Sequence, residues 1–562
     1  MSAAALREAA TLREAAAVRG SAPAPGSVCV LAIDVGTTAA KACVYSLGER
    51  IELVSSAQAE YPIRYLEGGG AEQDPEDWWT AACRGSRAAL LAAGLAPGQV
   101  RGLAFCCQMQ GLVLVNESGR ALRPAMSYMD QRATAQKRRG IERGLKVAGM
   151  SLGKLLPSLL VAGGVSASVK DPVWKYHWVR ENESEVFAKV AKWLDVKEYL
   201  VGRATGRFAM TPDSANATFL YDTRPGRGRW SPALCSLFDV DPAHLPEVMG
   251  PAEVAGPLKA SAAAELGLEV GTPVFGGGGD LSLIALGSGA TALGQAHVYM
   301  GTSGWVAACV DRRAVDTEAM AASVMGAIPG RYNYISEQET SGKCMEWMRD
   351  HLALDEIGLY LGARHAAEDS ESRYASIFDF LDETIEGVAP GAGGVIFAPW
   401  LHGSRSPFED PYARGIFFNI GVETGKRCLV RAVAEGLALQ CRWQLDAIRR
   451  KVEAKGPLRF VGGGARSRSL GALIADATGE RVEVPESPQN AGALGAAMLC
   501  AAGLGRATSV EEASRLVPIG ACYEPRAERL TLYEGHYAAL KRLYYANKGI
   551  FSMLNAPARG GR

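Results

Sequence analysis

Asp34-Val35-Gly36-Thr37-Thr38 directly follows the apolar run 28–33, and this stretch decides the fold class. Apolar β-branched residues favour a strand, and a glycine directly after a strand lets the backbone turn with positive φ. The bare turn also presents backbone N–H groups to a phosphate, while the hydroxyls of Thr37 and Thr38 add two donors. The stretch therefore predicts a strand that ends in a phosphate-binding turn.

Three more glycine-rich turns follow along the chain, two of them again directly after β-type apolar runs. They are Gly276-Gly277-Gly278-Gly279-Asp280, Gly301-Thr302-Ser303-Gly304 and Gly462-Gly463-Gly464-Ala465-Arg466. The pattern of strand, turn and strand at residues 28–46 is repeated at residues 294–310, which indicates a duplication. We therefore expect a duplicated α/β core with a nucleotide held in a cleft between two lobes.

Apolar periodicity predicts the elements around these turns. Strands are expected at residues 28–33, 40–46, 50–57, 294–300 and 306–310, and helices at 77–93, 426–455, 469–478 and 491–502. A stretch rich in Gly, Ser and Ala at 287–293 is the expected hinge. We expect an N-terminal extension (1–26), disordered or a frayed helix, an N-terminal lobe (27–287), a C-terminal lobe (288–545), and a C-terminal tail (546–562).

The composition is that of a globular protein with two domains. The 562 residues are 48% apolar and 21% charged, and two domains of roughly 250 residues each account for this length. Sixty basic residues balance sixty acidic ones, so no net field favours nucleic acid or an anionic membrane. The sequence contains no run of about 18 apolar residues, so no transmembrane helix is predicted. The expected partner is therefore a small molecule, and a homodimer stays open.

The twelve cysteines are scattered and form neither a disulfide pattern nor a zinc motif. This usage favours reduced thiols in a cytoplasmic protein.

Glycines interrupt the apolar residues 141–170, around the leucine-rich stretch 155–160. One interpretation is a lid or a membrane-touching loop. We favour a helix pair buried beneath the first lobe, because leucine runs are more often core than membrane anchors.

Several segments in a fixed order resemble the FGGY carbohydrate kinase family of the actin-like ATPase superfamily, and most of all its xylulokinase branch. These segments are residues 32–38, 72–79 (Glu-Gln-Asp-Pro-Glu-Asp-Trp-Trp), 172–182 (Pro-Val-Trp-Lys-Tyr-His-Trp-Val-Arg-Glu-Asn), and 413–415 with 431–436. They span roughly residues 28 to 545. The resemblance implies an α/β fold of two actin-like, ribonuclease H-like ATPase lobes, with ATP and Mg²⁺ as cofactors. It also implies that the lobe 27–287 is the sugar and phosphate side and the lobe 288–545 the nucleotide side.

Phosphoryl transfer needs a metal, donors around the phosphates and a base for the acceptor hydroxyl. Asp34 is the expected Mg²⁺ residue, with Gly36, Thr37 and Thr38 as the first phosphate loop; the alternative is an Asp that only stabilises a turn. The resemblance implies that Asp280 is the general base. Asp280 could also cap the helix that begins at Leu281.

The nucleotide residues come from the second half of the chain. Gly301, Thr302 and Ser303 are the expected second phosphate loop, and Gly462, Gly463, Gly464, Ala465 and Arg466 the expected adenosine turn, with Asn490 and Gly492 completing that pocket. For Arg466, a solvated surface charge is the competing interpretation.

The acceptor side departs from the family. Gln108, Met109 and Gln110 stand where xylulokinases carry a Met-His pair that touches the ketose, so Gln110 replaces the His. Leu281 replaces an Asn after the base. Asp130 is retained as a substrate residue. A site that reads hydroxyls through hydrogen bonds rejects analogues that lack them, so these exchanges could alter specificity.

Two further positions differ from the family pattern. Tyr128 replaces the usual Trp, although Arg132 is kept, and Asn419 stands where the second signature usually has Gly.

The resemblance implies a kinase that transfers the γ-phosphoryl group of MgATP to a hydroxyl of a small sugar, with D-xylulose as the leading candidate. The alternatives are another pentulose, a small polyol such as erythritol, or a non-metabolic ATPase switch or sugar sensor. The last class should lack the base or carry an appended domain, whereas Asp280 is present and no such domain is visible.

Overall fold

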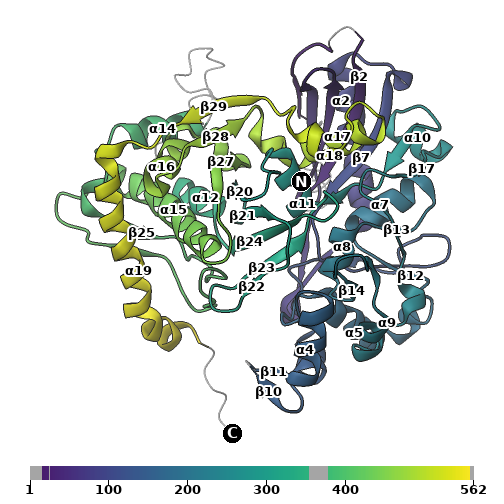
Figure 1. Cartoon of the computed structure of the whole chain (residues 1–562), viewed down its shortest axis with the longest axis horizontal. Coiled ribbons are helices and arrows are strands. Elements are labelled where there is room, and N and C mark those ends of the chain that lie inside the picture. The colour runs from purple at the N-terminus through teal and green to yellow at the C-terminus, as the bar shows by residue number, and fades with distance from the viewer. Residues whose placement is uncertain (1–15, 24–25, 148, 353–376, 557–562) are drawn as a thin grey trace, which may run out of the picture. The chain divides into compact units, whose positions relative to one another are not determined.

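The computed structural model describes residues 16–23, 26–147, 149–352 and 377–556, and these form two compact units. The first comprises the chain up to Gly289 together with Val324–Tyr332 and Asn490–Pro518; the second comprises Ala290–Ser323, Asn333–Gln489 and the chain from Ile519. The predicted lobes 27–287 and 288–545 are continuous segments and stay a prediction, whereas these units interleave along the chain (Figure 1).

The first unit is built on a mixed eight-stranded sheet. Its strands are, in spatial order, β1 (Ala16–Arg19), β4 (Ile51–Glu60), β3 (Ala39–Leu47), β2 (Val28–Val35), β7 (Val100–Cys107), β18 (Pro273–Phe275) and β17 (Val254–Pro257), and the short β19 (Gly278–Gly279) also pairs with β7. The hairpin β2–β3 is antiparallel, whereas β7 runs parallel to β2.

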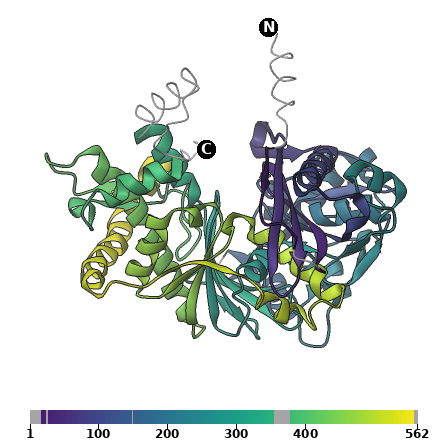
Figure 2. The ribbon, with the colours of Figure 1, turned by 90° about the horizontal axis from the view of Figure 1, so that it is seen from above.

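Alternate residues of β2 point to opposite faces of this sheet, as the pleat requires. Leu31 and Ile33 lie in the core with α2 (Pro75–Ala93), α7 (Val196–Thr205) and α10 (Ala260–Leu266). Val30 and Ala32 lie in a second core with α11 (Asp280–Gly287), α17 (Ala491–Gly503) and α18 (Val510–Ser514). In Figure 2, the purple strands β2–β4 stand beside the purple helix α2. The next even-numbered residue, Asp34, therefore belongs to the face covered by α17.

The second unit repeats this pattern. Its eight-stranded sheet has the order β22 (Val315–Asp316), β23 (Ala321–Met325), β24 (Tyr332–Gln338), β21 (Gly304–Val310), β20 (Gln295–Met300), β27 (Lys455–Val461), β28 (Val482–Pro485) and β29 (Ile519–Tyr523). The hairpin β20–β21 is antiparallel and β27 is parallel to β20, as β7 is to β2. The predicted duplication of the α/β core is confirmed.

Helices and short strands complete both units. In the first unit they are α3 (Thr134–Ile141), α4 (Leu152–Val161), α5 (Pro172–Asn182), α6 (Ser184–Phe187), α8 (Pro212–Ala217) and α9 (Pro232–Leu237), with β5 (Arg64–Leu66), β6 (Gly70–Gln73), β8 (Val113–Val115), β9 (Ala125–Met126), β10 (Lys146–Val147), β11 (Met150–Ser151), β12 (Lys192–Leu194), β13 (Ala209–Met210), β14 (Tyr221–Asp222), β15 (Arg229–Trp230) and β16 (Glu247–Val248). In the second unit they are α12 (Gly342–Leu352), α14 (Ile377–Glu386), α15 (Lys426–Arg449), α16 (Arg468–Thr478) and α19 (Ala527–Asn555), with β25 (Ile396–Ala398) and β26 (Ile416–Phe418).

Local sequence explains where the main helices begin and end. The carboxylate of Asp74 accepts a hydrogen bond from the N–H of Glu76 at the start of α2, Pro75 occupies its first position, and Gly94 ends it in the left-handed region. α17 is apolar on all sides and almost wholly buried, which is typical of a core helix.

Three predicted segments need correction. The helix predicted at 426–455 ends at Arg449, because Leu458, Phe460 and Val461 are buried in β27 beside β20, so the chain must leave the helix earlier. Within the extension 1–26, residues 1–15 and 24–25 lie outside the described residues, but Ala16–Arg19 forms β1. This strand pairs antiparallel with β4 and so satisfies backbone groups of β4 that would otherwise be unpaired. The tail predicted at 546–562 is helical up to Asn555, as the end of α19.

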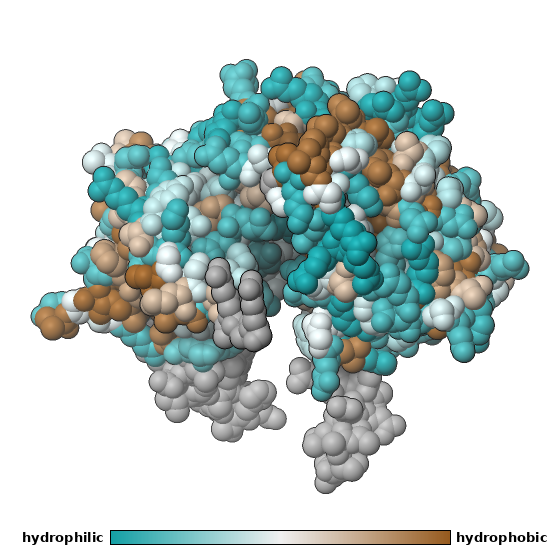
Figure 3. Space-filling model, turned by 90° about the horizontal axis from the view of Figure 1, so that it is seen from below, coloured by the Kyte–Doolittle hydropathy of each residue, from teal (hydrophilic) through white to brown (hydrophobic). Residues whose placement is uncertain are grey.

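The leucine-rich stretch is also only partly as predicted. It forms the single helix α4, in which Leu155 is buried, but Leu156 is 51% and Leu160 is 65% exposed. A buried helix pair is therefore wrong, because one face of α4 lies at the surface. On the face shown in Figure 3 hydrophilic residues predominate, and apolar residues gather in one brown area near the top of the view and in smaller groups elsewhere. Among the described residues, no helix has the length and apolarity that crossing a membrane requires.

Candidate active site

Two carboxylates stand at the ends of the two strands that flank β7 in the first sheet. In the register of the sheet, Cys106 of β7 lies opposite Asp34 of β2 on one side and opposite Gly278 of β19 on the other. Asp280 follows two residues after Gly278. Burial raises the pKa of the Cys106 thiol well above its ordinary value, and the charges of Asp34 and Asp280 raise it further. The charges of both carboxylates therefore reach the same thiol, that of Cys106, near the end of β7.

Asp34 lies in a partly buried position under the start of α17. Burial raises the pKa of Asp34, whereas Lys41, its partner on β3, and the Cys106 thiol lower it. A Cβ on Gly492 would overlap the Oδ2 atom of Asp34 and the sulfur of Cys106. Only glycine lets the first turn of α17 approach the carboxylate this closely.

The first glycine turn is held by its own backbone and by two tyrosines. The N–H of Gly36 donates to the carbonyl of Ala39 (3.0 Å), and the hydroxyl of Tyr61 donates to the carbonyl of Gly36. The hydroxyls of Thr37 and Tyr128 lie 3.2 Å apart. Thr38 is exposed. The turn is thus fixed while a threonine hydroxyl stays accessible at its tip.

The loop that carries Asp280 is fixed on both sides. The N–H of Gly279 donates to the Oδ2 atom of the fully buried Asp213 (2.8 Å), and the Nζ atom of Lys197 donates to the carbonyl of Gly276 (3.3 Å). Asp280 itself begins α11, and its Oδ1 atom accepts from the N–H of Leu281 at 2.8 Å. Asp280 is thus the first residue of α11 and not its N-cap, which is Gly279 and makes no side-chain cap hydrogen bond, so the capping role predicted as an alternative to the base is wrong.

The turn Gln108–Gly111 lies against this loop. A Cβ on Gly279 would overlap the side chain of Met109, so Met109 covers the residue directly before Asp280. Gln110 has a φ of 63°, a region in which glutamine is uncommon. The N–H of Gly111 donates to Asp195 (2.9 Å), whose pKa burial raises to about 7. Sequence-predicted acceptor residues and the predicted base are therefore brought together.

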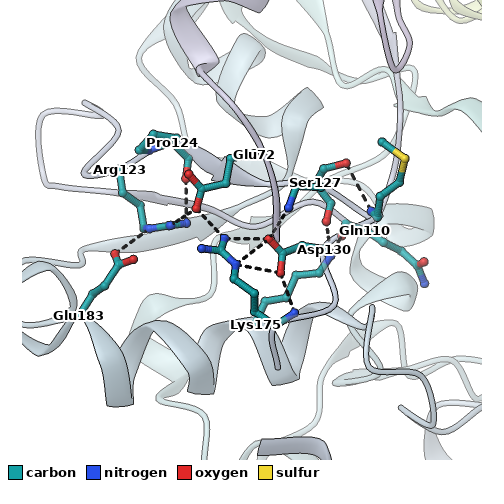
Figure 4. Close-up of polar contacts among 11 residues, drawn as sticks. Glu72, Gln110, Arg123, Pro124, Ser127, Asp130, Lys175 and Glu183 are labelled. Atoms are coloured by element: carbon teal, nitrogen blue, oxygen red, sulfur yellow. Dashed lines mark hydrogen bonds and ion pairs between the residues drawn. The ribbon is translucent and has the colours of Figure 1, made fainter. Parts of the chain in front are cut away.

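A buried lysine holds the carbonyl of Gln110. The Nζ atom of Lys175, on α5, donates to the carbonyls of Gln110 and Ser127, both at 2.8 Å (Figure 4). Lys175 has no exposed surface, and burial lowers its pKa to about 8, although Asp130 and Asp195 oppose this shift. Lys175 thus joins the turn at Gln110 to the loop that begins at Ser127.

Asp130 belongs to a network of ion pairs behind that turn (Figure 4). Its carboxylate is fully buried and accepts from the N–H of Ala71 (2.9 Å) and from Arg132 (2.7 Å). Arg132 also pairs with Glu72 at 2.5 Å, and Glu72 pairs with Arg123. These contacts hold the loop in place, and contact of Asp130 with the substrate stays a prediction. Leu281, the other replaced acceptor residue, is likewise buried.

In the second unit, the remaining predicted turns lie at the carboxyl ends of two parallel strands. β20 ends at Met300 and β27 at Val461, and Tyr299 is paired with Val461. Thr302 and Ser303 are exposed, and the carbonyl of Gly301 accepts from the N–H of Gly342 (2.7 Å) at the start of α12. Adjacent carboxyl ends of parallel strands are where open α/β sheets bind ligands.

The turn after β27 needs its first glycine. Gly462 has a φ of 97°, and a Cβ there would overlap the backbone of Met300. Residues Gly463–Arg466 then form a short 3₁₀ helix, in which Ala465 is buried and Arg466 exposed. Asn490, in the first unit, is buried, and its Nδ2 atom has no hydrogen-bond partner among the described residues. A buried amide donor without a partner favours a ligand contact.

Sequence reasoning missed the residues that fix these turns: Gln73, Lys175, Asp195, Lys197 and Asp213. Gln73 and Lys175 lie in segments that resemble the family, but nothing in a linear pattern shows which carbonyl a buried side chain reaches. For Lys175, the signal would have been a charge inside the largely apolar stretch 172–179.

The donors fit a magnesium ion held mostly by water and phosphate. Among the described residues, no group of three or more His, Cys, Asp or Glu side chains could hold a metal. Mg²⁺ usually keeps several waters and takes one or two carboxylates beside substrate phosphates. Asp34, at the end of β2 beside the first glycine turn, supplies such a carboxylate.

Comparisons with known proteins agree with this geometry. Residues 29–287 match the N-terminal domain, and residues 296–504 the C-terminal domain, of the FGGY family of carbohydrate kinases. The xylulose kinase of Escherichia coli (strain K12) is 28% identical over 514 residues, which cover 92% of this chain and 98% of the relative. A glycerol kinase of Thermococcus kodakarensis is 27% identical over 522 residues, covering 91% and 96%.

Solved structures extend the likeness to three dimensions. A crystal structure described as a xyloylose kinase from Brucella ovis has a TM-score of 0.77 and 26% identity, covering 93% of this chain and all of that one. Two family domains follow one another in order, and their residues include both carboxylates and all four glycine turns. The chain belongs to the FGGY family of carbohydrate kinases.

Proposed function

We propose that this sugar kinase transfers the γ-phosphoryl group of MgATP to a hydroxyl of a small sugar, with D-xylulose as the first candidate. The observation that carries the proposal is the pair of carboxylates, Asp34 and Asp280, at the ends of strands that flank β7. Together with the family and its xylulose kinase relatives, the pair supports a metal residue and a base on either side of one reacting centre.

In this proposal, each group of the first unit has one task. Asp280 accepts the proton of the acceptor hydroxyl while the oxygen of that hydroxyl forms the new bond to the γ-phosphorus. The bond from the γ-phosphorus to the oxygen that bridges it to the β-phosphorus breaks, which releases ADP. Asp34 holds Mg²⁺, with Thr37 and Thr38 donating to phosphate oxygens. The bound metal neutralises charge that develops on the phosphates.

Residues of the second unit would bind the nucleotide. Exposed hydroxyls at Thr302 and Ser303 support phosphate contacts, and the bare backbone at Gly462–Arg466 supports an adenosine contact. The unpartnered Nδ2 atom of Asn490 supports a further nucleotide contact from the first unit.

The acceptor itself has alternatives. Gln110 and Leu281 differ from the xylulokinase pattern, and a glycerol kinase is among the relatives. We therefore keep another pentulose or a small polyol as the second candidate class. We also propose a cytoplasmic location, supported by twelve cysteines that are all free thiols, and a homodimer stays open.

A coupled assay of ADP release tests the function. Purified protein with MgATP should release ADP when D-xylulose is added, and much less without sugar. A panel of ketoses, aldoses and polyols then ranks the acceptors by kcat/KM. Equal ADP release with and without every member of the panel would contradict the sugar kinase.

A further inference from the structure

Two buried glutamines join the first glycine turn to the turn beside Asp280. The Nε2 atom of Gln73 donates to the carbonyl of Thr37 (2.8 Å), and the Nε2 atom of Gln108 donates to the Oε1 atom of Gln73 (2.8 Å). Both side chains are almost fully buried. Residues 37, 73 and 108 come from three different connections of the sheet, so the fold alone brings them into one row.

The polarity of this row is fixed at one end. A backbone carbonyl can only accept, so Gln73 must turn its NH₂ group toward Thr37 and its oxygen toward Gln108. Gln108 must then turn its own NH₂ group toward Gln73. Its Oε1 atom is therefore left facing away from the row, as an acceptor.

That acceptor has no partner among the described residues, although it is buried. A buried polar atom without a hydrogen bond is costly, so a donor is expected there. The backbone of Gln108 is fixed as well, since its N–H donates to the carbonyl of Val35 (2.9 Å). The next residue, Met109, lies over Gly279 beside Asp280. A ligand donor that reaches Gln108 is therefore close to the base.

We propose that the Oε1 atom of Gln108 accepts a hydrogen bond from a hydroxyl of the acceptor other than the one phosphorylated, and that Gln73 is a positioning residue that fixes this polarity from Thr37. The proposal rests on the proposed sugar kinase function. It restricts the substrate class to acceptors with at least two hydroxyls. It also links the turn proposed to bind phosphate to the group that reads the acceptor.

The test uses Q108M and Q73M in the full chain, with D-xylulose as the probe. Q108M removes the acceptor atom, so KM for D-xylulose should rise roughly 3- to 10-fold, the effect of one neutral hydrogen bond. Q73M leaves that atom in place but frees its orientation, so it should raise KM by a smaller factor. In both variants kcat should change less than KM.

Q136M is the matched control. Gln136 is also buried in the first unit, its Nε2 atom bonds Glu181 (2.8 Å), and its Oε1 atom has no partner among the described residues, but it lies on α3, outside the proposed site. Q136M should keep KM within about twofold of the wild type. If Q136M raises KM as much as Q108M does, the effect reflects the loss of any buried amide, and the proposal fails.

Two further comparisons, one with deoxy analogues and one with the double variant, separate the loss of a direct contact between Gln108 and the sugar from a general loss of activity. The Q108M penalty should disappear for one of the 1-, 3- or 4-deoxy analogues of D-xylulose, namely the analogue that lacks the recognised hydroxyl. Q73M should add little in a Q108M background, because partners in one network are non-additive. An equal penalty for D-xylulose and all three analogues, or full additivity, would overturn the proposal. A wild type that releases no ADP with any sugar refutes the proposed function instead.

Discussion

At the scale of single residues, one substitution separates the proposed proton transfer to Asp280 from its hydrogen bond with Leu281. In D280N the amide oxygen can still accept from the N–H of Leu281, as Oδ1 does now, but the side chain cannot take up a proton. We expect kcat to fall by roughly 10²- to 10⁴-fold, with ATP affinity by calorimetry and the unfolding midpoint nearly unchanged. Near-normal turnover in D280N would show that Asp280 is not the base.

The replaced acceptor residues give a second prediction. Histidine tolerates the left-handed region better than glutamine, so Q110H should not destabilise a residue whose φ is 63°. Q110H combined with L281N should raise the preference for D-xylulose over the other sugars by roughly tenfold, as two neutral hydrogen bonds would. The measurement is the ratio of kcat/KM values over the sugar panel. An unchanged ratio would place specificity elsewhere.

The site role of a residue could be predicted where a glycine or a carboxylate follows a strand. It could not be predicted where a side chain contacts a residue far away in the sequence. The glycine turns single out Asp34 and Asp280, the resemblance implies the base role of Asp280, and the structure brings both residues to β7. Asn419 deviates from the family's glycine yet keeps the left-handed backbone, with a φ of 67°. Lys175 and Asp213 could not be assigned, because their partners are 65 and 66 residues away along the chain.

At the scale of elements, helices α11 and α17 cross with almost no space between them. A Cβ on Gly495 would overlap the carbonyl of Leu283, and one on Gly287 would overlap that of Ala491. G495A should therefore force the helices apart and destabilise the protein by about 1–3 kcal/mol. It should also lower kcat, because α11 begins with Asp280 and α17 packs beside Asp34.

G535A is the control for this prediction. Gly535 lies inside α19, and a Cβ there meets nothing within 4 Å. Alanine is a better helix former than glycine by about 1 kcal/mol, so G535A should be neutral or stabilising. Urea unfolding of both variants compares them directly. Equal effects of the two substitutions would mean that the crossing tolerates a methyl group.

Helix α5 contributes a pH dependence through Lys175. Because burial lowers the pKa of Lys175 to about 8, the folded protein releases this proton before the unfolded chain, whose lysine titrates near 10.4. Between these values the unfolded state binds more protons, so this group makes the wild type more stable as pH rises. K175M cannot titrate there. The stability of the wild type relative to K175M should therefore increase between pH 7 and 9.5.

Urea unfolding of both proteins at these two pH values measures that change. A neutral amine still has two N–H donors for the two carbonyls, so the contacts to Gln110 and Ser127 survive deprotonation. K175M loses both, and its KM for the acceptor should rise at either pH. A relative stability that stays constant would mean that the pKa of Lys175 is that of an exposed lysine, and one that falls would mean that folding raises it.

Elements were easier to predict than their ends or their neighbours. The strands and turns of both hairpins follow from apolar runs that end in glycine, and the duplication follows from their order. The end of α15 at Arg449 could not be predicted from the sequence, because the charged residues up to Lys455 are as compatible with a helix as those before them. β1 could not be predicted from its composition, since an alanine-rich stretch becomes a strand only beside the edge of β4.

At the scale of the whole molecule, the first unit depends on residues from near the end of the chain. Ala493, Leu494 and Met498 of α17 share one core with Val30 and Tyr45 of the first hairpin. A protein cut after Gly289 would lack these side chains and expose that core. We expect fragment 1–289 to show no cooperative urea transition and weak near-ultraviolet circular dichroism.

Restoring the missing helix should reverse this loss. A single chain that joins residues 1–289 through a flexible linker to 490–518 should regain a cooperative transition, because α17 and α18 then cover the face of β2 and β3 that carries Val30 and Ala32. The same linker with a scrambled 490–518 sequence is the control, since it has equal length and composition. If fragment 1–289 alone unfolds as cooperatively as the joined chain, the core is complete without α17. In that case the close packing of α17, through Gly492, against the carboxylate of Asp34 would not be needed to hold this carboxylate in position.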